Sequence, residues 1–214
     1  MTYNPMKKVI VIIFTVLSTI TTFGQSFEGK IFYANTYKSK NPKMTDQQWL
    51  TMMGSTQEYL IKDGDYKSIA NGILVQWQLY INKDNKLYNK MSNSESAFWF
   101  DGSNQKDEVI KIEVNKNALE VLGYKCDEII LTCKSGIQKY YFNSRFSVDS
   151  KLFTNHKFGN WYDYLSKSNS LPLKSIIDTD QFTIESISTE IKSMKLDSSI
   201  FNIPIGVKTE KSPY

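Results

Sequence analysis

The sequence predicts a mainly β protein: an antiparallel open half barrel of about ten strands with a short inserted helix and a long aromatic loop. Three observations predict it. Apolar and polar residues alternate along much of the chain, most clearly in 73–81, ILVQWQLYI. Dipeptides that favour tight turns, such as Asp63-Gly64 and Asn71-Gly72, separate these runs. A hydrophobic content of 41%, with 14% aromatic residues, is typical of a globular protein with a substantial core.

Residues 1–24 are expected to be a signal peptide. They contain Lys7 and Lys8, then the apolar run 9–17, and end in small residues up to Gly24. A membrane-spanning helix needs about 20 apolar residues, and hydroxyl side chains interrupt this run well before that. We therefore expect cleavage after Gly24 and export to the periplasm or beyond. The mature form is expected to be soluble and to have no transmembrane anchor.

The remaining chain is expected to form a single β domain over residues 25–207, followed by an unstructured polar tail, 208–214. Removing Lys7 and Lys8 with the signal lowers the formal charge from +4 to +2. The basic residues are mostly isolated lysines, and Arg145 is the sole arginine, whereas phosphate recognition favours clustered basic groups. No nucleic-acid partner is expected.

The alternating runs define the expected strands. In the run 73–81, Trp77 and Leu79 share one face with Ile73, Val75 and Ile81, and we expect this face to be buried. The other face, with Gln76, Gln78 and Tyr80, is expected to contact solvent. The full set of expected strands is 27–37, 57–62, 66–70, 73–81, 86–91, 109–114, 124–133, 137–143, 173–178 and 182–193.

Two stretches depart from the alternation. Thr45 and Gln48 have the spacing of a capping box, and Gly54 can end the helix that they begin. A short helix is therefore expected between the first two strands. Residues 151–170 are aromatic but interrupted by Gly159 and polar residues, which favours a long loop or an irregular helical segment that crosses the sheet.

Cys126 and Cys133 lie seven residues apart in one expected strand. In a straight strand they point to opposite faces and are roughly 23 Å apart, whereas a disulfide needs Cα atoms within about 7 Å. We expect two separate, semi-buried thiols; a sharp bend near Asp127 is the alternative that would let them pair. A metal site is not expected, because His156 is the single histidine and no C-x-x-C motif is present.

No catalytic constellation is apparent, so an enzyme is not expected and no cofactor is assigned. A Ser-His-acid triad would need His156, which we expect to be a surface or capping residue of its loop, and no serine stands in a G-x-S-x-G context. Paired aspartates such as Asp63 with Asp65 flank turns, where they favour backbone hydrogen bonds.

Three short motifs resemble a known family: FEGKIFY at 27–33, LGYKC at 122–126 and LDSSIFNIPIG at 196–206. They are similar to exported Bacteroidota proteins of unknown function whose domain resembles the LolA/LolB lipoprotein-carrier fold. That resemblance implies an incomplete antiparallel barrel wrapped over helices.

The aromatic surplus suggests a function. We expect a non-enzymatic envelope protein that holds a lipid or another apolar ligand against the concave face of its sheet, because aromatic and methionine side chains suit adaptable apolar sites. Plain core packing is the alternative role for these side chains, above all for Trp77. The alternative function is an interaction or scaffold module that docks on an envelope protein partner and binds no small ligand. The candidate ligand-binding residues are Trp77, Trp99, Phe100, Trp161, Met52 and Met53.

Overall fold

The computed structural model describes residues 26–105 and 107–213. The predicted signal peptide, residues 1–24, lies outside the described residues. Within the described residues, no helix is long and apolar enough to cross a membrane.

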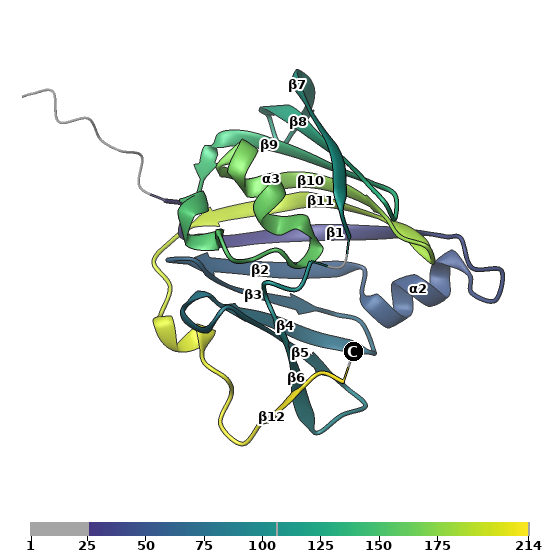
Figure 1. The fold of residues 1–214 in the computed structure, drawn as a ribbon, viewed down its shortest axis with the longest axis vertical. Coiled ribbons are helices and arrows are strands. Elements are labelled where there is room, and N and C mark those ends of the chain that lie inside the picture. Colours follow the sequence, from purple (N-terminus) through teal and green to yellow (C-terminus); the bar gives the residue numbers. More distant parts are fainter. Residues whose placement is uncertain (1–25, 106, 214) are drawn as a thin grey trace, which may run out of the picture.

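The described chain forms one large, mostly antiparallel sheet that curls without closing, as Figure 1 shows. Twelve strands follow one another in the order β12-β6-β5-β4-β3-β2-β1-β11-β10-β9-β8-β7. The prediction of a mainly β, open barrel-like fold is therefore confirmed. The strands are β1 (Gly29–Ser39), β2 (Thr56–Lys62), β3 (Asp65–Ala70), β4 (Val75–Ile81), β5 (Lys86–Met91), β6 (Ser96–Asp101), β7 (Val109–Val121), β8 (Tyr124–Cys133), β9 (Ile137–Ser147), β10 (Ser170–Asp178), β11 (Phe182–Ser193) and β12 (Lys208–Lys211).

Two short α-helices accompany the sheet. The predicted helix between the first two strands is α2 (Asp46–Met53), and both hydrogen bonds of its capping box are present: Gln48 N to Thr45 Oγ1 at 3.1 Å, and Thr45 N to Gln48 Oε1 at 2.7 Å. The second helix is α3 (Trp161–Ser168). It follows two 3-10 turns, η2 (Ser150–Phe153) and η3 (Phe158–Asn160), and lies over the face of β8 to β11 in Figure 1.

Local turn chemistry fixes the first hairpin. Asp63 and Gly64, between β2 and β3, have φ angles of 49° and 90°. Positive φ at both central residues is the requirement of a type I′ turn, whose twist matches that of the paired strands. The register that follows pairs Ile61 with Tyr66 and Tyr59 with Ser68. This register places both tyrosines on the same face of the sheet.

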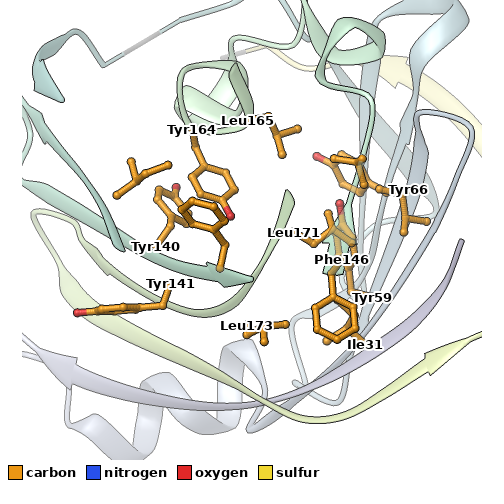
Figure 2. Close-up of a cluster of buried hydrophobic side chains, with 14 of the residues drawn as sticks. Ile31, Tyr59, Tyr66, Tyr140, Tyr141, Phe146, Tyr164, Leu165, Leu171 and Leu173 are labelled. Carbon is orange, nitrogen blue, oxygen red and sulfur yellow. The ribbon is translucent and has the colours of Figure 1, made fainter. Parts of the chain in front are cut away.

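Hydrophobic side chains gather on both faces of the sheet. The larger cluster includes Ile31, Tyr80 and Leu87, together with Tyr164 and Leu165 of α3. Figure 2 shows Tyr164 and Leu165 above the labelled tyrosines and leucines of this cluster. The smaller cluster lies on the opposite face, because its members alternate along the strands with members of the larger one. It consists of Leu60, Leu79 and Tyr88, with Leu196 and Phe201 from the C-terminal segment.

This arrangement corrects the expectation for 73–81. Leu79 and Tyr80 are both 0% exposed, so β4 is covered on both faces at this point and the predicted solvent-exposed face is wrong there. The turn η4 (Ser198–Phe201) contacts β3 and β4 and covers the side of Leu79. Ile73, expected in the strand, lies before it and is 66% exposed, because the strand begins at Val75.

Two strands had not been predicted. The segment of β6, SAFWFD, is a nearly continuous apolar run without alternation. Residues 208–211, expected to be part of an unstructured tail, form β12 and pair in parallel with β6, with Lys208 opposite Ser96 and Lys211 opposite Trp99. Without β12, β6 would be an edge strand with unpaired backbone groups. A polar segment can pair with these groups although it has no apolar residue of its own.

Candidate ligand cavity

A cavity of about 300 Å³ lies on the larger-cluster side of the sheet, beneath the start of α3. Phe158, Gly159 and Trp161 from η3 and α3 cover it. Its other walls come from strands β1 to β5 and β9 to β11. These wall residues are Tyr33, Gln57, Tyr59, Tyr66, Ser68, Gln78, Leu87, Tyr140, Pro172, Ser175, Ile177, Ile184 and Ser186.

Strand register explains why these wall residues meet. Tyr33 pairs with Gln57, and Ser175 pairs with Ser186. Partners on neighbouring strands project to the same face, and every second residue along a strand does so too. The inward positions of β1, β2, β10 and β11 therefore form one continuous lining, in which rings and short polar side chains are mixed.

A stack of rings links the covering segment to the sheet. Tyr59 stacks on Tyr66, with ring centroids 5.2 Å apart, and Tyr66 stacks on Tyr80 at 5.3 Å. His156, which precedes η3, lies 4.0 Å from the ring of Tyr80. Its Nε2 is 2.8 Å from the hydroxyl oxygen of Tyr66, and the two atoms share a hydrogen bond. His156 thus fastens residues 150–168 to β3 and β4.

The expectation that His156 lies at the surface is wrong. The residue is 1% exposed. Burial disfavours the charged imidazolium and lowers the pKa of His156 to about 3, so the ring is neutral at ordinary pH. The two rings stacked on it, Tyr66 and Tyr80, come from β3 and β4, far from residue 156 in the sequence, and such an environment leaves no local pattern.

The cavity lining is electrically neutral. None of the sixteen lining residues carries a carboxylate, an ammonium or a guanidinium group. Burial raises the pKa values of the Tyr33, Tyr66 and Tyr140 phenols well above their usual range, so these side chains are uncharged hydroxyls. The hydroxyl of Tyr33 donates a hydrogen bond to the carbonyl oxygen of Pro172 at 2.7 Å.

Some polar atoms on or beside the lining have no hydrogen-bond partner among the described residues. Two belong to lining residues: the hydroxyl of Tyr59 and the indole Nε1 of Trp161. Two more, Asn35 Oδ1 and Ser188 Oγ, belong to residues opposite or next to the lining positions of β1 and β11. Buried polar groups are usually paired, so these four atoms leave unused hydrogen-bonding capacity in and beside the cavity wall.

The structure does not gather the six predicted site residues into one cleft. Trp161 lines the cavity, and the ring of Phe100 is 5.8 Å from that of Phe158 in the covering segment. Trp77 and Trp99 pack against the smaller cluster on the opposite face. Met52 borders a surface hollow beside α2, and Met53 is half-buried at the end of that helix.

Sequence reasoning missed the tyrosines and serines of the lining. Tyr59 and Tyr66 flank the Asp63-Gly64 turn on the same face of their hairpin, which the predicted register could have shown. The alternation in 73–81 correctly puts Gln78 and Tyr80 on a common face, but it predicts that this face contacts solvent. Ser175 and Ser186 carry no distinguishing signal in the sequence, because their pairing joins two strands whose register only the folded sheet defines.

The two cysteines are free, as predicted, and both are buried rather than semi-buried. Asn160 Nδ2 donates to Cys133 Sγ at 3.2 Å, and the thiol of Cys126 donates to the carbonyl oxygen of Tyr124 at 3.3 Å. Burial raises the pKa of Cys133 to about 11, which keeps its thiol protonated and unreactive. Among the described residues, no group of three or more His, Cys, Asp or Glu side chains could hold a metal ion.

Comparisons with known proteins add little to this description. No family model matches the chain, and no curated protein matches it. Among solved structures, the chain is similar to the crystal structure of LprF from Mycobacterium bovis, with 10% sequence identity and a TM-score of 0.32, over 79% of this chain and 88% of that one. A likeness of this extent carries no argument about function, which therefore rests on the cavity.

Proposed function

We propose that this protein is an exported, non-enzymatic envelope protein that holds a lipid or another apolar ligand in the cavity beneath α3. Residues 25–207, together with β12, would act as one domain of the lipoprotein-carrier type. The observation that carries the proposal is the cavity itself: a neutral space of about 300 Å³ whose walls combine aromatic and aliphatic side chains with uncharged serines and glutamines. Pockets that bind small molecules share this composition, with apolar walls for affinity and a few polar groups for orientation.

The covering segment supports a binding role. It is anchored to the sheet by His156 and by the stacking of Tyr164 on Tyr140, with ring centroids 4.3 Å apart. Gly159, at the cavity, has a φ of 64°, and a Cβ added there would meet nothing within 4 Å. The covering segment is therefore not packed tightly at this point, which leaves space for a ligand.

Binding of Nile red, a neutral apolar dye, tests the proposal. We expect its fluorescence to rise and saturate with the wild-type protein. Ser186→Phe places a ring in the cavity and should abolish the signal, whereas Ser193→Phe, at an exposed position of the same strand, should leave it unchanged. Failure of the wild-type protein to bind the dye, or equal binding by both variants, would contradict the proposal.

A second candidate function is supported by strand β7. This strand forms one edge of the sheet, and its Ile110 and Val114 side chains are 64% and 48% exposed. Exposed apolar side chains on an unpaired edge are a feature of surfaces that recruit a further strand. An interaction module of this kind would lose its partner in the variant Ile110→Lys, with dye binding in the cavity unaffected.

A further inference from the structure

We propose that the cavity selects a ligand whose polar end is uncharged: a single-chain amphiphile with an ester carbonyl or hydroxyl group, of the monoacylglycerol class. This inference rests on the proposed function and deepens it, because it names the chemistry of the ligand. Three independent features of the cavity support it: the absence of charge in its lining, the donors that lack partners, and its size.

Charge is the first feature. An ionised carboxylate or a phosphate buried without a cation is strongly disfavoured, and proteins that bind these groups supply arginine or lysine. No cationic side chain lines this cavity. Lys174, adjacent in sequence to the lining residue Ser175, is held in an ion pair with Glu185 at 3.0 Å. A free fatty acid or a phospholipid would therefore bury its charge without compensation.

Hydrogen bonding is the second feature. The Trp161 indole nitrogen can only donate, and the Tyr59 hydroxyl is free to donate because it has no partner among the described residues. Both residues line the cavity, but their polar atoms are themselves buried, so a ligand pairs with them only after a rotation of the two side chains. An oxygen of an ester or an alcohol is a neutral acceptor that matches such donors. The hydroxyl groups of Ser175 and Ser186, which face one another across β10 and β11, add neutral groups that both donate and accept.

Size is the third feature. A volume of about 300 Å³ stands at the lower end of the usual range for ligand pockets, roughly 300 to 1,000 Å³. One acyl chain with a small head group suits such a space better than the two chains of a diacyl lipid. The aromatic walls supply the apolar contacts for that chain, and the polar groups hold its head.

Competition against Nile red tests the choice of head group. Monoolein and sodium oleate, which have the same chain, are delivered from cyclodextrin at pH 8, where oleate is ionised. We expect monoolein to displace the dye at a concentration at least about ten-fold lower than oleate. Equal or stronger displacement by oleate would overturn the neutral-head inference and leave the proposed function standing. A failure of Nile red itself to bind would overturn both.

Tyr59→Phe tests the donor directly. We expect monoolein to bind about 3- to 10-fold more weakly, since one hydrogen bond is lost. Nile red affinity and the melting temperature of the unliganded protein should not fall, because the hydroxyl has no partner to lose there. Tyr88→Phe is the matched control: a buried tyrosine in the smaller cluster on the opposite face. Equal effects of the two variants on monoolein binding would refute the role of Tyr59.

Discussion

Lowering the pH should destabilise this protein through His156 before its carboxylates respond. Burial lowers the pKa of His156 from 6.5 to about 3. The folded protein therefore keeps the ring neutral, whereas the unfolded chain takes up a proton as the pH falls below 6.5. The associated stability is fully present above pH 6.5 and is lost progressively as the pH falls toward 3.

The magnitude follows from linkage. Each pH unit between the two pKa values is worth about 1.36 kcal/mol. Between pH 8 and pH 5 the unfolded chain has passed its pKa by about 1.5 units, and the folded protein is still about 2 units above its own. We therefore expect the free energy of unfolding to fall by about 2 kcal/mol over this interval. The groups stacked on His156, Tyr66 and Tyr80, are phenols whose pKa values are raised by burial, so they stay neutral throughout.

Urea unfolding at pH 8 and at pH 5, followed by tryptophan fluorescence, measures this loss. His156→Gln is the control, because it removes the titrating ring and should leave a nearly flat response over the same interval. Carboxylates contribute little to the loss of stability above pH 5, because their pKa values in the unfolded chain are about 4. The same loss of stability in wild type and variant would show that His156 is not the responsible group.

Three further predictions concern the thiols, the smaller cluster and α2. Cys126→Ser and Cys133→Ser should each lower the free energy of unfolding by an amount on the order of 1 to 2 kcal/mol, and the two losses should be additive. The intact mass after alkylation in denaturant without reductant should show two modified thiols. A chain without modified thiols would contain a disulfide. Phe201→Ala should cost about 3 kcal/mol in urea unfolding, because the C-terminal segment would lose its main anchor over β4. Thr45→Ala should cost about 1 kcal/mol by removing one half of the capping box, and a change below the error of a thermal melt would contradict that role.

Strand positions were predictable because two local signals agree. Alternation marks a strand, and dipeptides such as Asp63-Gly64 mark where it must turn. The same signals cannot say which face meets the larger core. In β4, Leu79 and Tyr80 are equally buried, one under the C-terminal segment and one under the ring of His156. The residues that cover the two faces are distant from β4 in the sequence, so the alternation within β4 alone could not predict them.

The candidate site was harder to predict for a related reason. Tryptophan and methionine were chosen for their apolar character, yet Trp77 and Trp99 pack on the opposite face and tyrosines form much of the lining. A tyrosine ring packs like an apolar side chain and its hydroxyl needs a partner, so it suits a wall between a core and a cavity. Trp161, predicted from the aromatic loop that crosses the sheet, lies in the wall of the cavity.

The place of β1 in the sheet has a consequence for how the chain reaches its native state. β1 is the first described strand, yet it lies between β2 and β11, and its Gly29 pairs with Ser193 near the end of the last long strand. Contacts so distant in sequence are slow to form, because the loop between them must close first. Until β11 arrives, one edge of β1 stays open to wrong partners. The folding protein is therefore most prone to aggregate until the last long hairpin, β10 with β11, has formed and paired with β1.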